Sequence, residues 1–102
     1  MSKCIFCEIA LGNIPAKIIG QTDNLIAFHD INPQAPTHIL VVPKKHVDLP
    51  GEILGEMAVM ARKLAGDQDY RLVVNNGASA GQSVFHLHMH VLSGRDFSWP
   101  PG

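Results

Sequence analysis

The spacing of apolar residues predicts two helices in this chain. Over residues 2–12 one short helix is expected, with Ser2 as its cap and Gly12 as its end. Its apolar stripe consists of Ile5, Phe6, Ile9 and Ala10. A longer helix is predicted over residues 51–65, with acidic residues early, basic residues late and Gly66 just beyond. Its buried stripe consists of Ile53, Leu54, Met57, Met60, Ala61 and Leu64.

Short apolar runs between turn residues predict strands. They cover residues 15–20, 25–29, 38–42, 70–75 and 84–92. Residues 21–24 form a turn, the prolines of 32–36 mark a loop, and residues 76–83 form a polar, glycine-rich loop. The order predicts an α+β fold with a five-stranded antiparallel sheet and one long and one short helix. Exposed edges of such a sheet favour a dimer.

Three histidines occupy alternate positions of the last predicted strand, at His86, His88 and His90. Side chains alternate along a strand, so the three imidazoles should share one face, with apolar residues on the other. Packing alone does not explain this arrangement, because a solvent-facing strand would more often carry Thr, Lys or Glu. Neutral imidazole is a nucleophile at pH 7, and the preceding loop could offer backbone N–H groups and a hydroxyl to phosphate. The pattern therefore favours attack by histidine on phosphorus.

Composition and net charge narrow the classes of molecule that the chain is expected to bind. The chain has 102 residues, 46% of them hydrophobic, and a net charge of −1, which fits one domain over residues 1–102. Weak net charge argues against nucleic acid or an acidic membrane as a partner, and the apolar runs are too short to span a bilayer. The first residues show no secretory pattern, so a cytoplasmic location is expected. Two cysteines in a reducing compartment are more often thiols or metal ligands than a disulfide.

The stretch from His86 to Leu92 resembles the signature of the histidine triad nucleotide-binding proteins. Further matches to the Hint branch lie at 28–31, 33–38, 43–46, 81–83 and 99–102. The resemblance implies the histidine triad (HIT) fold and a homodimer that hydrolyses the P–N bond of purine nucleoside phosphoramidates. In such a dimer Trp99 would reach toward the partner's site.

The same resemblance implies a role for each matching residue. His88 would be the nucleophile, and His90 and Ser83 would contact phosphate oxygens or the leaving group. His38 and His86 would complete the polar network behind it. The other implied nucleotide-binding residues are Asp30 for the ribose, Ile31, Phe6 and Phe28 for the purine, and Asn75, Gly81 and Gln82 on the phosphate side. Simpler interpretations stay open: the two phenylalanines as ordinary core and Asp30 as an Asx turn.

The pair Cys4 and Cys7 is half of a metal site by its C-x-x-C spacing, which puts both sulfurs on one helical face. Two small buried residues or a redox pair are the alternatives. Two more ligands are available in His46 and one of the triad histidines. Resemblance to zinc-binding members of the wider superfamily implies Cys4, Cys7, His46 and His86 as ligands of a structural zinc ion. No cofactor is expected to be required for catalysis.

Three other functions compete with phosphoramidate hydrolysis. A dinucleoside polyphosphate hydrolase of the neighbouring Fhit-like branch is one, although the terminal residues 99–102 argue against it. A regulatory module that binds nucleotide or zinc with little turnover is another. In the third, the alternating histidines bind a catalytic metal ion.

One departure from the family is the short stretch from His46 to Tyr70, which affects local packing and removes no catalytic position.

Overall fold

The computed structural model describes residues 4–102, which form one antiparallel sheet and two α-helices. The elements in chain order are α1 (Ile5–Ala10), β1 (Ile18–Gln21), β2 (Leu25–His29), β3 (Thr37–Pro43), α2 (Ile53–Ala65), β4 (Tyr70–Val73), the 3-10 turn η1 (Ala78–Ala80) and β5 (Met89–Ser93). The five strands lie in the order β1-β2-β3-β5-β4, and every neighbouring pair is antiparallel. The predicted α+β architecture is confirmed.

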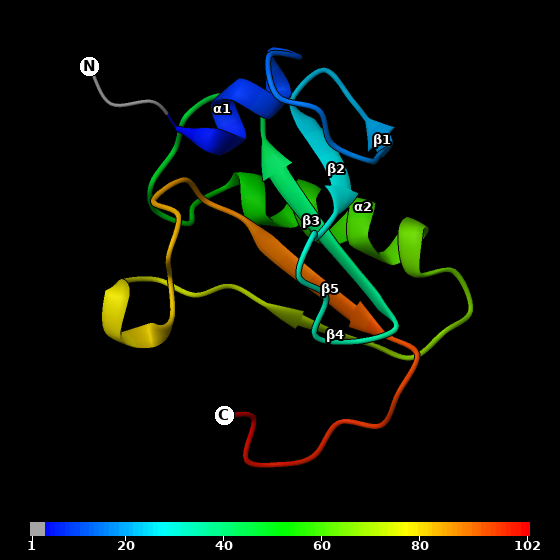
Figure 1. Cartoon of the computed structure of the whole chain (residues 1–102). Coiled ribbons are helices and arrows are strands. Elements are labelled where there is room, and N and C mark those ends of the chain that lie inside the picture. The colour runs from blue at the N-terminus through cyan, green and yellow to red at the C-terminus, as the bar shows by residue number, and fades with distance from the viewer. Residues whose placement is uncertain (1–3) are drawn as a thin grey trace.

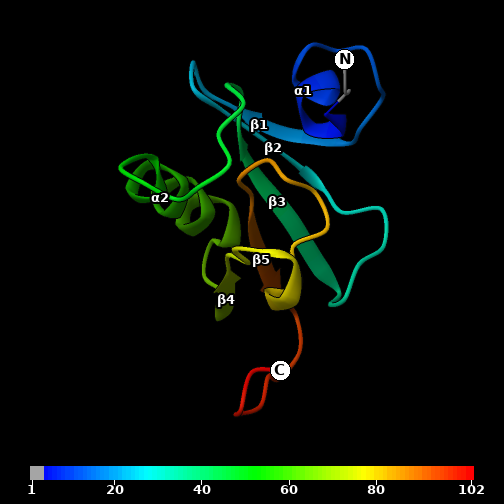
Figure 2. The same cartoon turned by 90° about the vertical axis from the view of Figure 1, so that its left-hand side faces the viewer.

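The sheet separates the two helices (Figure 1), and Figure 2 shows α2 and α1 on opposite sides of it. Successive side chains of β2 and β3 alternate between these sides. Leu25, Ala27, Ile39 and Val41 pack in a core with α2, whereas Ile26, Phe28, Leu40 and Val42 pack with Phe6 and Ile9 of α1. Both central strands are thus buried on both faces. This explains why their sequences are almost continuously apolar.

The helices are shorter than predicted. The first begins at Ile5 with Cys4 at its N-cap, and Leu11 is its C-cap. The expected cap Ser2 lies outside the described residues. The second helix begins at Ile53 and ends at Ala65, and its C-cap Gly66 has a positive φ of 64°. Met57 and Ala61 of its predicted stripe are fully buried, and the remaining members are partly buried against the same core.

The last strand begins later than predicted, at Met89 instead of residue 84. Val41 pairs with Met89, and continuing the ladder would place Pro43 opposite Leu87. Pro43 has no N–H to donate, so the ladder ends there. The backbone N–H of Leu87 donates instead to the carbonyl of Val47 at 2.6 Å, and the Pro43 carbonyl accepts from the His86 ring at 2.7 Å.

The alternation of side chains nevertheless continues through residues 86–91. Leu87, Met89 and Val91 lie in the core beneath α2. The rings of His86 and His88 instead lie against Phe6 of α1, and His90 lies beside His88 with ring centroids 5.0 Å apart. The predicted separation of histidines from apolar residues therefore holds, although only His90 belongs to the paired strand. None of the helices in residues 4–102 is long and apolar enough to cross a membrane.

Replacement of Leu25 by alanine tests the core beneath α2. Leu25 is fully buried, and we expect Leu25→Ala to lower the free energy of unfolding by about 2–5 kcal/mol because it leaves a cavity. Leu11→Ala is the matched control: Leu11 is 73% exposed, and the change should stay within about 0.5 kcal/mol. Urea denaturation of the two variants measures the difference, and equal costs would contradict the assigned core.

Candidate active site and metal centre

A cavity of about 590 Å³ lies on the α1 side of the sheet. Such a volume is typical of sites for small molecules. Its apolar lining comes from Ile5, Phe6, Ile9, Ile14, Pro15, Ala16, Phe28, Ile31, Leu40 and Val84. Its polar lining comes from His29, Asp30, Asn32, Gln34, His38, Gly81, Ser83, His88 and His90. Among the lining residues that the structure describes, none is Lys or Arg, so an anion here would be bound by imidazole, hydroxyl or amide hydrogen-bond donors.

His88 presents one ring nitrogen to this cavity. Its Nδ1–H donates to the backbone carbonyl of His86 at 2.8 Å, and a carbonyl can only accept. In the neutral ring this leaves Nε2 with a lone pair. Within residues 4–102 no partner binds Nε2, and no buried side-chain nitrogen is left unpaired, so Nε2 is accessible. A lone pair held in one tautomer at a cavity wall is what a nucleophilic histidine requires.

His38 and His90 form a directed hydrogen-bond chain beside His88. The backbone N–H of Gln34 donates to His38 Nδ1 at 3.0 Å, so the proton of a neutral His38 is on Nε2. His38 Nε2–H then donates to His90 Nδ1 at 2.8 Å. This places the proton of a neutral His90 on its Nε2, and His90 also lines the cavity. One accepting nitrogen and one donating N–H thus lie on neighbouring rings.

Both rings of this chain are neutral near pH 7. Burial lowers the pKa of His38, although the Asp30 carboxylate opposes the shift. Burial, followed by the neighbouring His88 and His38 rings, lowers the pKa of His90 to about 4. Desolvation thus outweighs the carboxylate. Neutral rings are what the tautomer assignments require.

Asp30, Phe6 and Phe28 each have a structural role in the fold and also line the cavity. One oxygen of Asp30 accepts the N–H of Asn32 at 2.8 Å, which is the Asx turn expected as the simpler interpretation, and the other lies 3.4 Å from His38 Nε2. Phe6 and Phe28 are buried core residues whose rings meet edge to face, and both also line the cavity. Ile31 lines it as well, although the residue is 96% exposed.

The glycine-rich loop differs from its expected role as a set of free backbone donors. The N–H groups of Gly77, Ala80, Gly81 and Gln82 all bind oxygens within the loop. Gln82 is buried, and its side chain accepts from Gly77 at 2.8 Å and donates to the Val84 carbonyl at 3.1 Å. Neither Gln82 nor Asn75 lines the cavity, whereas Gly81 and Ser83 do. Gln82 therefore shapes the loop, and Ser83 carries its hydroxyl to the cavity.

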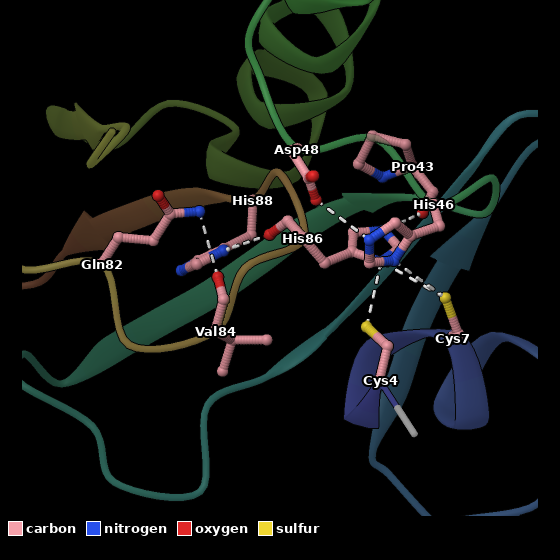
Figure 3. A network of polar contacts seen from close by, with 9 residues as sticks. All are labelled: Cys4, Cys7, Pro43, His46, Asp48, Gln82, Val84, His86 and His88. Carbon is pink, nitrogen blue, oxygen red and sulfur yellow. Dashed lines mark hydrogen bonds and ion pairs between the residues drawn. The ribbon is translucent and has the colours of Figure 1, made fainter. Parts of the chain in front are cut away.

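A second group of side chains converges beside α1, as Figure 3 shows. His86 Nδ1 lies 3.3 Å from Cys4 Sγ and 3.5 Å from Cys7 Sγ, and His46 Nδ1 lies 3.4 Å from Cys7 Sγ. In a tetrahedral zinc site, Zn–S bonds of about 2.3 Å and Zn–N bonds of about 2.0 Å put sulfur and nitrogen about 3.5 Å apart. The four predicted ligands thus already have the spacing of a zinc site.

The outer nitrogens of these two histidines also fit metal ligation. His86 Nε2–H donates to the Pro43 carbonyl and His46 Nε2–H donates to Asp48 at 3.0 Å, so both Nδ1 lone pairs face the sulfurs. Metal-bound histidines typically have such partners. In a second cluster, Asp30, His38 and His90, the possible ligand atoms also lie within 4.8 Å of one another. There the Gln34 N–H already occupies the lone pair of His38 Nδ1 and leaves a proton on Nε2, so this cluster is arranged for hydrogen bonding.

Several groups that take part in the candidate site could not be recognised from the sequence. The Gln34 N–H and the Pro43 carbonyl are backbone groups. Every residue has such a carbonyl, and every residue except proline has such an N–H. Asp48 follows His46 by two residues, a spacing that could have indicated a partner for the outer nitrogen. His29 also lines the cavity. Trp99 is 82% exposed and does not line the cavity of its own chain.

Residues 11–97 match the model of the HIT domain family. This chain belongs to the HIT family. Among curated relatives, it is 47% identical to an uncharacterized HIT-like protein of Synechocystis, with 96% of each chain covered. It is 40% identical to a 14 kDa zinc-binding protein of Zea mays, over 99% of this chain and 89% of that one. It is 35% identical to the adenylylsulfatase HINT1 of Arabidopsis thaliana, over 99% of this chain and 78% of that one.

Solved structures of HIT proteins superpose closely on this HIT domain. A HIT family hydrolase from Legionella pneumophila has a TM-score of 0.91 at 45% identity, with 98% of this chain and 100% of that chain covered. A zinc-bound histidine triad family protein from Mycobacterium smegmatis has a TM-score of 0.84 at 32% identity, with 97% and 79% covered. The predicted resemblance and fold are confirmed.

The neutral His90 predicts how stability depends on pH. Its pKa is about 4 in the folded chain against 6.5 for an ordinary histidine, so between these values the unfolded chain binds more protons. We expect the free energy of unfolding to fall as pH is lowered from about 6.5 to about 4. His90→Asn, which keeps an acceptor for His38, should flatten part of this slope. Denaturant titrations across this pH range measure it, and an unchanged slope would contradict the assignment.

Proposed function

We propose that this HIT domain hydrolyses nucleoside 5′-phosphoramidates through a covalent intermediate on His88. The observation that carries the proposal is the accessible Nε2 lone pair of His88, fixed by the Nδ1 bond to the His86 carbonyl and adjacent to the Nε2–H of His90. The cavity offers an apolar part suited to a base and a histidine-rich part suited to phosphate. Asp30 lies between them in the proposed pose, at the ribose.

The first chemical step forms a bond between His88 Nε2 and the α-phosphorus while the P–N bond to the leaving amine breaks. The departing nitrogen must gain a proton. An anionic phosphate bound beside His90 favours a second proton on that ring, taken up on Nδ1 while the His38 Nε2–H turns to the Asp30 carboxylate 3.4 Å away, so His90 can donate from Nε2. The Ser83 hydroxyl and the ring N–H groups stabilise charge on the phosphoryl oxygens.

The second step returns the site to its starting state. Water attacks the phosphorus of the nucleotidyl-histidine, the P–Nε2 bond breaks, and its electron pair returns to His88. His90 Nε2, neutral after the first step, accepts the proton of the attacking water. The products are a nucleoside 5′-monophosphate and the amine, and the protein is regenerated without a redox change.

A second candidate substrate is adenylyl sulfate, because one relative is named an adenylylsulfatase. The same attack on the α-phosphorus would release sulfate, which needs no proton on departure. A dinucleoside polyphosphate hydrolase would use the same nucleophile, and a binding module would use none. These alternatives differ in their dependence on His88 and in the leaving group, so one experiment separates them.

Brief mixing with adenosine 5′-phosphoramidate, followed by intact-mass measurement, tests the nucleophile. We expect an adduct of the mass of an adenylyl group on the wild-type chain, none on His88→Ala, and a turnover loss of at least about 10³-fold in that variant. Parallel reactions with adenylyl sulfate and diadenosine polyphosphates should be slower. Ser83→Ala should lower the rate, whereas Ser79→Ala, exposed on the same loop, serves as the matched control. Binding without adduct or turnover would instead identify a binding module.

We also propose that Cys4, Cys7, His46 and His86 bind a structural zinc ion. Support comes from the sulfur–nitrogen spacing, the outer partners Pro43 and Asp48, and the relatives described as zinc-binding and zinc-bound. Four protein ligands leave no open position, so the ion would link α1 to the sheet and supply no Lewis acid for the reaction. His86 would then connect the metal centre to His88 through its own backbone carbonyl.

Metal analysis of the purified protein tests this site. We expect about one zinc per chain, lost in Cys4→Ser together with a lower melting temperature, because binding energy of the ion contributes to folding. His90→Asn is the control and should keep its zinc, since His90 lies outside the cluster. Loss of metal in His90→Asn with retention in Cys4→Ser would show that the triad binds the ion instead.

We further propose a homodimer, as the Hint-like branch implies. Strand β4 is an edge of the sheet, its Leu72 is 37% exposed, and the exposed Trp99 follows on the same chain. Pairing of two such edges would join the sheets and cover these side chains. In that assembly Trp99 would contact the neighbouring cavity.

A further inference from the structure

The segment after β5 returns to the loop that precedes β3. Gly94 has a φ of +93°, and a Cβ at this position would lie 2.8 Å from Pro36 Cβ, so only glycine allows this close approach. The next residue, Arg95, donates from Nε to the Gln34 carbonyl at 3.2 Å and from Nη1 to the Asp96 carbonyl at 3.0 Å. Two adjacent residues thus fix the backbone around Gln34.

The Arg95 side chain is itself held in place. Its guanidinium lies over the Phe97 ring at 4.2 Å, and Arg71 lies over the same ring at 5.0 Å. Arg71 also donates to the Ser98 carbonyl at 2.9 Å. Among residues 4–102, no carboxylate lies within ion-pair distance of Arg95. Its charge is therefore used for carbonyl hydrogen bonds and ring stacking, for which a planar guanidinium is well suited.

Gln34 connects these Arg95 contacts to the candidate active site. Its carbonyl accepts from Arg95, and its N–H donates to His38 Nδ1 at 3.0 Å. This N–H is what places the His38 proton on Nε2, from which it is donated to His90 Nδ1 at 2.8 Å. His90 in turn keeps its own proton on the nitrogen that faces the cavity. A contact at Arg95 thus reaches His90 through three consecutive hydrogen bonds.

We propose that Arg95 is a positioning residue for the reaction, because it fixes the Gln34 backbone and thereby the tautomer of His38 and the orientation of His90. The inference rests on the proposed function for its kinetic consequence, and on geometry alone for the tautomer. Arg95 is remote from the substrate in this scheme. Its loss should impair protonation of the leaving group more than substrate binding.

The primary test measures the ring nitrogens of His38 by ¹⁵N NMR near pH 7. The wild-type protein should show a single Nε2–H tautomer, and Arg95→Met should show a mixture with the Nδ1–H form. Arg95→Lys keeps a donor and should be intermediate. Arg62→Met, on the exposed face of α2, is the matched control and should show the wild-type spectrum. An unchanged single tautomer in folded Arg95→Met overturns the proposal, whether or not the protein turns over a phosphoramidate.

Kinetics test the link to catalysis. With a phosphoramidate of a basic amine, Arg95→Met should lower kcat by about tenfold and change KM by less than about twofold, because proton transfer is affected more than binding. With a good leaving group the loss should shrink. In a His38→Asn background, Arg95→Met should have no further effect on kcat, since the connection is already broken. Equal losses in both backgrounds would indicate general destabilisation and overturn the inference.

If wild-type protein forms no adduct and shows no turnover, the proposed function fails and the tautomer result still decides the role of Arg95. If turnover is present and Arg95→Met changes neither kcat nor the His38 spectrum, the proposed function stands and the positioning role fails. Should Arg95→Met not fold, Arg95→Lys carries the same comparison through its partial shift in tautomer and rate.

Discussion

Three imidazole rings are buried in this small domain, and burying an imidazole is costly unless its nitrogens have partners. His38, His86 and His88 are each at most 5% exposed. The partner of one nitrogen decides whether the other carries a proton or a lone pair. The hydrogen bond made by one nitrogen of each ring therefore fixes the state of the other nitrogen. At His86 the other nitrogen offers a lone pair to sulfur, and at His88 it offers a lone pair to the cavity.

His86 is where these requirements meet. Its Nε2–H is bound by the Pro43 carbonyl, its Nδ1 faces two cysteines, and its own carbonyl holds His88. The same proline ends the pairing of β3 with β5, so residues 86–88 lie outside that ladder while the alternation of their side chains is kept. The candidate metal ligand His86 and the candidate nucleophile His88 thus lie two residues apart, and the His86 carbonyl connects them.

The architecture was largely predictable from sequence. Alternating Leu87, Met89 and Val91 indicated the core face, and the C-x-x-C pair with His46 and His86 indicated a cluster that the structure does bring together. The start of β5 was wrong because a periodic pattern shows alternation but not whether a partner strand can accept the ladder. Which amides of the glycine-rich loop are engaged was not predictable: those of Gly77, Ala80, Gly81 and Gln82 bind oxygens within the loop.

The sequence by itself determined which side chains share a face, because the period of two in a strand and the spacing along a helix are local geometry. It also determined the donor types available for phosphate and metal. Only the tertiary structure decided which nitrogen of each histidine is free, since that depends on backbone groups of Gln34, Pro43 and His86 brought in from elsewhere in the chain. Backbone N–H and carbonyl groups are the same at every such position, so their partners become visible only when the chain is folded.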